Sequence, residues 1–354
     1  MAGTRVVGLD IGTTGVRAAQ LEFGSGGPSA TSQPTLTRVA HVPLPHGAVR
    51  DGEVADQDAV GSALRTLWTT GKFDTREVVT GVGNPRIVVR DLELPSMPMA
   101  QLRASLKYQV SEMLPMQVSD ALLDYYPTGE YDGENGRTVV GMLVAAPLDS
   151  VTTNVLAAEG AGLLPTMVDL NSFALVRALA RGDLLQRTVA IVDIGARTTN
   201  VVIATGGVPR LVRLLRAGGQ DTTEAVASTM QLAHAEAEQV KRDLGVGFQA
   251  APGYESAADA VMATTNSLVE AVRNTLSFYT SNHPGSGVDV VVLTGGGAHL
   301  PGLGQYLSSV TRLPVSLGDP ISSVRVGKTV DRGSLSGYES LLTVAVGLAY
   351  GVAA

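Results

Sequence analysis

The segment Val7-Gly-Leu-Asp-Ile-Gly-Thr-Thr14 decides the fold, because it reappears as Ala190-Ile-Val-Asp-Ile-Gly-Ala-Arg197. The two aspartates, Asp10 and Asp193, are separated by about half of the 354 residues. Self-similarity at such a spacing is the signature of duplicated structural units. The simplest explanation is two related lobes that each open with a strand ending in Asp-Ile-Gly; a coincidental match is the alternative.

Both copies are followed by a second stretch suited to a strand, Val16 to Phe23 in the first and Thr199 to Ala204 in the second. Each unit is therefore predicted to be a β-hairpin. A P-loop or a Rossmann glycine loop leads instead from a strand into a helix, whose N-terminus holds the phosphate. Neither of those two motifs fits this chain.

Between the copies lies a segment punctuated by prolines, which predicts an inserted subdomain in the first lobe. Its expected elements are strands over Ile87 to Leu94, Leu122 to Tyr126 and Thr138 to Ala145, a helix over Met99 to Met113, and a hairpin loop over Thr128 to Gly136. After the second copy, the pattern predicts helices over Thr222 to Leu244, Ala257 to Thr280 and Ser334 to Tyr350, and a buried strand over Val288 to Leu293.

Composition narrows the classes of function. The net charge of −7 argues against general nucleic-acid binding, which needs a basic face. The absence of cysteine rules out disulfides and thiolate metal sites, and it fits a reducing cytoplasm. Met1 to Arg5 lacks the features of a signal peptide, so we expect an unexported protein. The apolar run Leu341 to Ala354 is too short to span a bilayer and is expected to be a buried helix.

The two hairpins carry the groups that a polyphosphate and magnesium require: flexible backbone, hydroxyls and carboxylates that leave the metal partly hydrated. The alternative is a pair of tight turns with satisfied aspartates. The candidate residues are Gly12, Gly15 and Gly195 for the backbone, Thr13, Thr14, Thr198 and Thr199 for hydroxyls, and Asp10 and Asp193 for the metal.

Two further motifs support a nucleotide site. The triple glycine Gly295-Gly296-Gly297 directly follows an apolar strand and would permit flat contact with a base and ribose, although a permissive turn is the alternative. Glu238 and Lys241 are three residues apart on one predicted helix face and could hold a ribose. A surface salt bridge is the alternative for that pair.

The order of these motifs is similar to the actin, Hsp70 and sugar-kinase superfamily, and the match covers nearly the whole chain. Within it, Leu94-Pro-Ser-Met-Pro98, Leu114-Pro115, Asp124-Tyr125 and Gly295-Gly-Gly-Ala-His-Leu-Pro-Gly302 resemble the PilM family of type IV pilus assembly proteins. Tyr108-Gln109 and Met116 depart from the family pattern, in which Trp-Glu and phenylalanine are frequent.

The resemblance implies an α/β, two-lobed, actin-like ATPase fold with duplicated RNase H-like lobes. The lobes and subdomains that it implies are a first lobe of residues 1–84 and 147–187, an inserted α+β subdomain of residues 85–146, a second lobe of residues 188–220 and 287–354, and a smaller subdomain of residues 221–286.

The resemblance also implies ATP or ADP with Mg²⁺ in the cleft. By motif position, the residues near phosphates or metal are Asp10, Gly12, Thr13, Thr14, Gly15, Arg17, Asp193, Gly195, Ala196, Arg197, Thr198 and Thr199. Arg17 stands where relatives usually carry lysine. Glu238 and Lys241 would lie near ribose, and Gly295 to Gly297 near adenosine.

The implied partner is the N-terminal cytoplasmic tail of a PilN-like inner-membrane protein, bound in a groove of the insert, with pilus motor ATPases as further candidates. The protein would be a cytoplasmic scaffold recruited to the inner face of the membrane through proteins. We expect slow or negligible ATP hydrolysis, because no residue is identified that positions an attacking water. Self-association in rows stays open.

Two other functions share this fold. A metabolite kinase would need a general base beside the acceptor hydroxyl, and none stands out. A filament protein of the FtsA or MreB type is the stronger alternative. An FtsA-type membrane helix would be basic and bulky at the C-terminus, whereas this chain ends Tyr350-Gly-Val-Ala-Ala354. The five histidines show no spacing typical of metal ligands, so no transition metal is expected.

Overall fold

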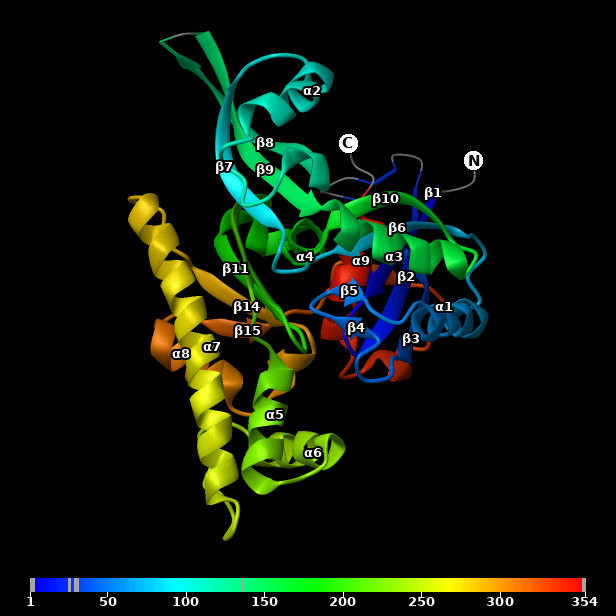
Figure 1. Ribbon diagram of the computed structural model, residues 1–354, viewed down its shortest axis with the longest axis vertical. Coiled ribbons are helices and arrows are strands. Elements are labelled where there is room, and N and C mark those ends of the chain that lie inside the picture. Colours follow the sequence, from blue (N-terminus) through cyan, green and yellow to red (C-terminus); the bar gives the residue numbers. More distant parts are fainter. Residues whose placement is uncertain (1–3, 25–26, 29–31, 135, 352–354) are drawn as a thin grey trace.

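Two mixed β-sheets, each covered by helices, form two lobes with a cleft between them. The computed structural model describes residues 4–24, 27–28, 32–134 and 136–351. In Figure 1 the first lobe (blue) lies at the right, the second lobe (green to orange) at the left and below, and the inserted segment (cyan and green) at the top.

The first sheet has the strand order β10-β6-β1-β2-β3-β16. Its strands are β1 (Thr4–Ile11), β2 (Gly15–Phe23), β3 (Thr35–Pro43), β6 (Glu77–Val82), β10 (Leu164–Leu170) and β16 (Arg325–Val326). Alternate residues of β1 point to opposite faces, as the two-residue repeat of a strand requires. Val7 and Leu9 pack with α1 (Gln57–Gly71) and α3 (Leu148–Gly160), while Val6 packs in the core between the lobes.

The second sheet has the order β13-β12-β11-β14-β15. Its strands are β11 (Thr188–Ile194), β12 (Thr199–Thr205), β13 (Val208–Leu215), β14 (Val290–Thr294) and β15 (Val315–Leu317). The order and directions repeat those of β3-β2-β1-β6-β10: two antiparallel pairs are followed by two parallel pairs in both sheets. The predicted duplication of the hairpins is therefore confirmed, and it extends to whole sheets.

Two short helices join the lobes. These are α4 (Asn171–Leu179), which leads into the second sheet, and α9 (Thr343–Ala349), which returns to the first. One core cluster runs from β1 and β2 through both helices to β11 and β12. Small residues permit this contact: a Cβ on Gly8 would lie 2.0 Å from the Ala345 carbonyl oxygen, and one on Gly347 would lie 1.9 Å from that of Ala174.

The second lobe carries the smaller subdomain. Helices α5 (Gly219–Met230), α6 (His234–Leu244) and the first half of α7 (Glu255–Asn282) share a core that includes Val226, Ala237 and Val261. The rest of α7 and α8 (Leu303–Thr311) cover the second sheet.

The insert is a three-stranded antiparallel sheet, β7-β9-β8, with one helix. Its elements are β7 (Val88–Pro95), α2 (Met99–Gln109), β8 (Ala121–Gly133) and β9 (Gly136–Pro147). Leu102 and Leu106 of α2 pack on Tyr125 and Leu143 of the sheet. The remaining short elements are β4 (Val49–Arg50), β5 (Glu53–Val54), and the 3₁₀ turns η1 (Val118–Asp120), η2 (Gly182–Gln186), η3 (Gly296–His299), η4 (Gly333–Leu335) and η5 (Glu339–Leu342).

Some predicted elements were wrong. The expected helix Thr222 to Leu244 is two helices, because Gln231 adopts a left-handed φ of 54° and ends α5 without a glycine or proline to mark the break. The expected loop Thr128 to Gly136 is mostly strand, since β8 and β9 pair out to Gly133 and Gly136 as a ribbon exposed to solvent; residue 135 lies outside the described residues.

Two expected helices are shorter than predicted. Helix α2 ends at Gln109 rather than Met113. The C-terminal helix begins only at Thr343, because the residues before it form two separate 3₁₀ turns, η4 and η5, with Gly337 at a φ of +82° between them. Every residue of α9 is buried, as expected for part of the run Leu341 to Ala354, while residues 352–354 of that run lie outside the described residues.

Candidate functional site

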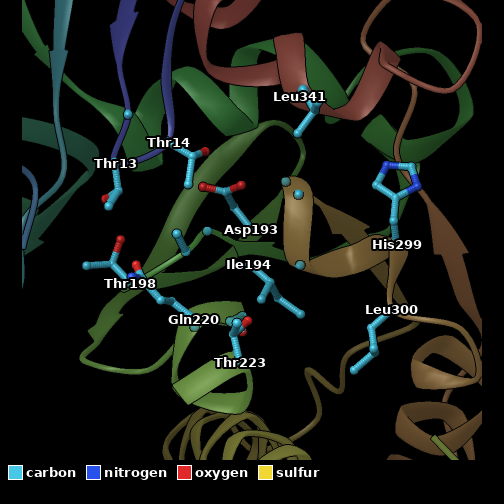
Figure 2. Close-up of a pocket in the computed structure, with 18 of the residues that line it drawn as sticks. Thr13, Thr14, Asp193, Ile194, Thr198, Gln220, Thr223, His299, Leu300 and Leu341 are labelled. Carbon is cyan, nitrogen blue, oxygen red and sulfur yellow. The ribbon is translucent and has the colours of Figure 1, made fainter. Parts of the chain in front are cut away.

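A cleft of about 900 Å³ lies between the two lobes. Its lining comes from both Asp-Ile-Gly hairpins, the start of α5, helix α6, part of α7, the loop after β14, and the segment from Gly337 to Val344. Figure 2 shows Thr13 and Thr14 on one wall, Asp193 and Thr198 on the other, and Gln220 and Thr223 on α5 below them. Ligand pockets in proteins commonly have volumes of roughly 300–1,000 Å³. The cleft can therefore hold a ligand as large as a nucleotide.

The first hairpin presents the tip Gly12–Thr14 to the cleft. The Gly12 amide donates to the Gly15 carbonyl at 3.1 Å, which closes the turn. Behind it, Arg17 Nη1 donates to Asp10 Oδ2 at 3.3 Å and to the Gly15 carbonyl at 3.3 Å. The Arg17 Nε is buried and has no hydrogen-bond partner in the described part of the chain. A ligand with acceptor oxygens would give the guanidinium further partners.

The second hairpin has the same backbone geometry. The Gly195 amide donates to the Thr198 carbonyl at 2.9 Å. Asn200 occupies the position equivalent to Arg17, and its Nδ2 donates to Asp193 Oδ2 at 3.1 Å. The two aspartates thus have different partners: a cation beside Asp10 and a neutral amide beside Asp193.

This difference shapes the electrostatics of the cleft. Burial raises the pKa of the Asp10 carboxyl, and Arg17 partly offsets that rise. Burial, together with repulsion from Asp10, raises the pKa of Asp193 to about 6, against the opposing effects of Asn200 and Arg17. Asp193 is therefore a carboxylate whose charge the protein alone compensates poorly. A bound cation would compensate it, because opposite charge favours the ionised form.

The third wall is the N-terminus of α5, which is tied to the second hairpin. The amides of Gly219 and Gln220 donate to the carbonyls of Gly195 and Ala196 at 2.9 and 2.8 Å. A Cβ on Gly218 would lie 2.5 Å from the Ala196 carbonyl oxygen, so a glycine is required for this approach.

Lys241 and Glu238 line the cleft but are bonded mainly to the protein. Lys241 Nζ donates to the Gly219 carbonyl at 3.0 Å, to Thr223 Oγ1 at 2.9 Å and to Glu238 Oε2 at 2.6 Å. Glu238 also accepts from Arg242 Nε at 2.8 Å. An ammonium group has three donors, so Lys241 is saturated, and its first task is to fasten α6 to the start of α5.

The glycine loop after β14 lies against the second hairpin. Gly295 has a φ of +82°, and a Cβ there would lie 2.5 Å from Asp193 Oδ1 and 2.6 Å from the Ile194 carbonyl oxygen. A Cβ on Gly297 would lie 2.3 Å from Ile194 Cγ2. The Gly295 amide is 3.4 Å from the Ser340 carbonyl oxygen, which connects the loop to the C-terminal segment.

The structure brings most of the predicted site residues into one cleft. Those that line it are Asp10, Gly12, Thr13, Thr14, Arg17, Asp193, Gly195, Ala196, Thr198, Glu238, Lys241, Gly295, Gly296 and Gly297. Three others lie behind the lining: Gly15 packs on His41, Arg197 pairs with Asp221 and Glu224, and Thr199 is buried with its hydroxyl bonded to the Ala217 carbonyl at 2.8 Å.

Sequence reasoning missed other lining residues, among them Asn200, Gln220, Thr223, His46 and His234. Asn200 could have been predicted from the sequence, because it follows Asp193 at the same spacing as Arg17 follows Asp10. His46 could not have been predicted from the sequence, since it lies on a loop of the first lobe that only the tertiary fold brings next to α5.

Within the described residues, no group of three or more histidine, aspartate or glutamate side chains is arranged to hold a metal ion. Asp10 and Asp193 are the acidic side chains of the two hairpin strands that line the cleft. A magnesium ion there would need its other ligands from a phosphate and water, which is its usual preference in nucleotide sites.

Comparison with known proteins agrees with this geometry. The model of the family "Type IV pilus assembly protein PilM" matches residues 8–351. A solved structure described as the "PilM-PilN type IV pilus biogenesis complex" is similar with a TM-score of 0.84 and 28% identity, over 97% of both chains. The cell division protein FtsA of Bacillus subtilis (strain 168) is 21% identical over 89% of this chain and 78% of that protein.

More distant structures share the fold. The ethanolamine utilization protein EutJ from Carboxydothermus hydrogenoformans is similar with a TM-score of 0.57 and 15% identity, over 99% of this chain and 91% of that one. MreB 5 of Spiroplasma citri, solved with AMPPNP bound, has a TM-score of 0.52 and 14% identity, over 97% of this chain and 94% of that one. The fold is thus that of the actin-like ATPases.

No helix of the described residues combines the length and the apolar character needed to cross a membrane.

The family match covers both hairpins, the insert and the glycine loop, and the strand order repeats in both lobes as an actin-like fold requires. The chain belongs to the type IV pilus assembly protein PilM family.

Proposed function

We propose that this protein is an ATP-binding scaffold of type IV pilus assembly, which holds ATP or ADP with Mg²⁺ in the cleft and binds the N-terminal cytoplasmic tail of a PilN-like inner-membrane protein. The observation that carries the proposal is the cleft itself, in which two equivalent Asp-Ile-Gly hairpins from the two lobes face one another. In this account the protein works on the cytoplasmic side and reaches the membrane and the pilus motor through its partners.

The cleft fits a nucleotide in three respects. The hairpin tips offer backbone and threonine hydroxyls at Thr13, Thr14 and Thr198. Arg17 is a buried cation whose Nε has no hydrogen-bond partner among the described residues. Gly295, Gly296 and Gly297 of the loop after β14 line the cleft, so the loop presents backbone rather than side chains to a flat base and ribose. Arg17 and the hairpin amides would hold the phosphates, and the Gly295 to Gly297 loop would lie against the adenosine.

Magnesium fits the acidic pair. When bound, the ion would neutralise phosphate charge and bridge phosphate oxygens to the protein. Asp193 is the better ligand, because its pKa of about 6 reflects an uncompensated charge. Asp10 already has Arg17 as its cation.

The insert supports the partner assignment because it touches both lobes. Its strands β7 and β8 contact β13 of the second lobe, and the ring of Tyr126 lies 4.7 Å from that of Phe173 on α4. Asp91 of β7 is near Arg213 and His283 of the second lobe, which counter the rise that burial causes in its pKa. A change in the angle between the lobes would therefore move or reshape the insert, where we place the peptide groove.

Slow turnover is part of the proposal. Three carboxylates of the cleft already have partners: Asp10 has Arg17, Asp221 accepts from the Gly218 amide at 2.7 Å, and Glu238 has Lys241. Asp193 is assigned to the metal. We therefore assign no carboxylate in the cleft as the base that would activate a water.

Titration calorimetry of the purified protein with ATP and Mg²⁺ tests the nucleotide claim. Asp193→Asn removes the metal-facing charge and is expected to weaken binding by at least about tenfold. Asp259→Asn makes the same chemical change at an exposed position of α7 and should leave binding unchanged. Absence of binding by the wild-type protein would overturn the proposal, as would equal binding by Asp193→Asn.

The partner claim is tested with a synthetic peptide copying the N-terminal tail of a PilN-like protein. We expect binding that is lost when the insert surface is altered. ATP binding without any peptide binding, together with sedimentation of polymers, would instead favour an MreB-like or FtsA-like filament.

A further inference from the structure

The insert is joined to the first lobe by two chain connections that meet at one point. The first is the turn between β6 and β7, which contains Arg86, and the second is the junction of β9 with α3, which contains Asp149 and Ser150. Arg86 Nη2 donates to both carboxylate oxygens of Asp149 at 3.1 Å, and Arg86 Nη1 donates to Ser150 Oγ at 3.3 Å. The guanidinium therefore ties the entry to the insert to its exit.

Glu53 of β5 fastens this junction to the rest of the first lobe. Its Oε1 accepts from Arg86 Nη1 at 3.0 Å and from Ser150 Oγ at 2.5 Å, and Ser150 is buried. An isolated ion pair at the surface contributes little to stability, whereas a network that includes a bidentate arginine–carboxylate pair and a buried hydroxyl holds a defined geometry. We call Glu53, Arg86, Asp149 and Ser150 the foot clamp.

The foot clamp is packed onto the wall of the cleft. Gly52, in the turn before β5, lines the cleft, and so does Asn154 of α3. Asn154 Oδ1 accepts from the Val54 amide at 3.2 Å, and Asn154 Nδ2 donates to the Gly52 carbonyl at 3.3 Å. A Cβ on Gly52 would lie 3.0 Å from the Cβ of Asn84, whose Oδ1 accepts from the Arg86 amide at 2.9 Å. The foot of the insert and this part of the cleft wall are therefore one packed unit.

The contact of the insert with the second lobe is of another kind. Strands β7 and β8 pack on β13, and Tyr126 packs on Phe173 of α4. Asp91 and Arg213 attract each other across this face. Among the residues that the structure describes, however, no hydrogen bond or ion pair joins the insert to β13 or α4. Apolar packing is non-directional and tolerates small sliding movements, whereas hydrogen bonds of fixed geometry do not.

We propose that the foot clamp makes the insert a rigid extension of the first lobe, so that a rotation between the lobes is taken up by sliding of the insert over β13 and α4. The insert then follows the first lobe, and only its face with the second lobe changes. The clamp is present in the protein without nucleotide, and its consequence for a peptide bound to the insert rests on the proposed function. Figure 1 shows the insert above both lobes, with α3 directly after its last strand.

Spin labels test this directly, because the chain has no cysteine of its own. Ala104→Cys on α2 marks the insert, Ser62→Cys on α1 marks the first lobe, and Ser267→Cys on α7 marks the second lobe; all three positions are exposed. Pulsed electron paramagnetic resonance gives the distribution of distances for the 104–62 pair and for the 104–267 pair in the nucleotide-free protein. We expect a narrow distribution for the first pair and a broader one for the second.

Variants assign the narrow distribution to the clamp. Arg86→Met removes the guanidinium, and we expect the share of molecules outside the main 104–62 distance to rise roughly five- to tenfold. Arg86→Lys keeps the charge without the bidentate pairing and should give an intermediate rise. Asp149→Asn is a smaller change that should widen the same distribution, and it serves where Arg86→Met does not fold. Arg137→Met breaks an ion pair with Glu130 inside the insert and should leave the distribution unchanged.

A 104–62 distribution that is narrow in the wild type and in Arg137→Met, and wide in Arg86→Met or Asp149→Asn, supports the clamp. The same width in the wild type and in the clamp variants overturns it, and so does an equal widening in Arg137→Met. A wild-type 104–62 distribution as broad as that of the 104–267 pair, or broader, also overturns it. No nucleotide or peptide is present, so failure of the proposed function would leave this result unaffected.

Discussion

Asp10 and Asp193 occupy equivalent positions in the two hairpins, yet only Asp193 lacks a cationic partner. In the nucleotide-free protein, the raised pKa of Asp193, about 6, means that the folded state holds a proton more tightly than the unfolded state. The stability from that proton is full below the usual carboxyl pKa of 3.8 and is lost as the pH rises through about 6. The ionised Asp193 therefore lowers the free energy of unfolding at neutral pH when no metal is bound.

We predict that Asp193→Asn raises the stability of the nucleotide-free protein at about pH 7.5 by about 1–2 kcal/mol, because an uncharged amide removes both the burial cost and the repulsion from Asp10. The gain should shrink towards pH 4, where the carboxyl is protonated. Urea unfolding at several pH values measures it. A variant that is less stable than the wild type at pH 7.5 would contradict the assignment.

A second residue-level prediction concerns Gly295. Both Gly295 and Gly285 have left-handed φ angles, of +82° and +84°. Only Gly295 is crowded, since its Cβ would meet Asp193 and Ile194, whereas Gly285 faces open space. We expect Gly285→Ala to cost about 1–2 kcal/mol from backbone strain alone. Gly295→Ala should cost more, about 3 kcal/mol or above, and equal losses in thermal unfolding would rule out the close approach.

Among single residues, those that the repeat marked were the ones predictable from sequence. Asp10, Asp193, Thr13 and Thr198 reached the cleft because the hairpin geometry is local. Residues such as Gln220 and His46 could not be predicted, because only the packing of one lobe on the other brings them together.

Helices α4 and α9 pack on each other and join the two lobes. Gly347 of α9 lies directly against the Ala174 carbonyl of α4, and Arg177 Nε donates to the Gly347 carbonyl at 3.1 Å. Alanine is a better helix former than glycine by about 1 kcal/mol, so propensity alone predicts that Gly347→Ala stabilises the protein. The close contact between Gly347 and the Ala174 carbonyl predicts instead that Gly347→Ala destabilises the protein.

We expect Gly347→Ala to cost about 2–3 kcal/mol, because a methyl group cannot enter the contact without separating the two helices. Gly160→Ala, at the end of α3 where a Cβ meets open space, serves as the control and should be neutral or slightly stabilising. Chemical unfolding of both variants measures the difference. A stable Gly347→Ala protein would show that the helices can move apart at little cost.

Element boundaries were predictable where a strand is buried at nearly every position. The hairpin strands are of this kind, so each is written in the sequence as a continuous, mostly apolar run next to its Asp-Ile-Gly turn. The distal ribbon of β8 is largely exposed, and its backbone pairing leaves no pattern of apolar residues in the sequence. The break between α5 and α6 depends on a single left-handed residue, Gln231, which carries no mark in composition.

The whole molecule combines a cleft that the two lobes share with an insert that touches both lobes. We propose boundaries for the insert near residues 85 and 146, because β7 begins at Val88 and β9 ends at Pro147. The relation of the two sheets could be predicted from the sequence repeat. The position of the insert on β13 and α4 could not be predicted, because those contacts join segments that are distant in the sequence.

This arrangement predicts that nucleotide and peptide affinities are coupled through the insert. Tyr126→Ala removes the ring contact with Phe173 on α4 and should reduce the coupling while leaving ATP binding in the cleft unchanged. Tyr131→Ala, at an exposed position on the distal ribbon of the same strand, is the matched control and should keep the coupling. Equal coupling in both variants would show that the signal takes another route.

The most direct measurement is the affinity of the wild-type protein for the PilN-like peptide, determined by calorimetry without nucleotide and with saturating ATP and Mg²⁺. A coupled scaffold predicts two dissociation constants that differ by roughly 5- to 150-fold, with an equal and reciprocal effect of the peptide on ATP affinity. Identical constants in the two conditions would contradict the account, because the cleft and the insert would then be independent sites.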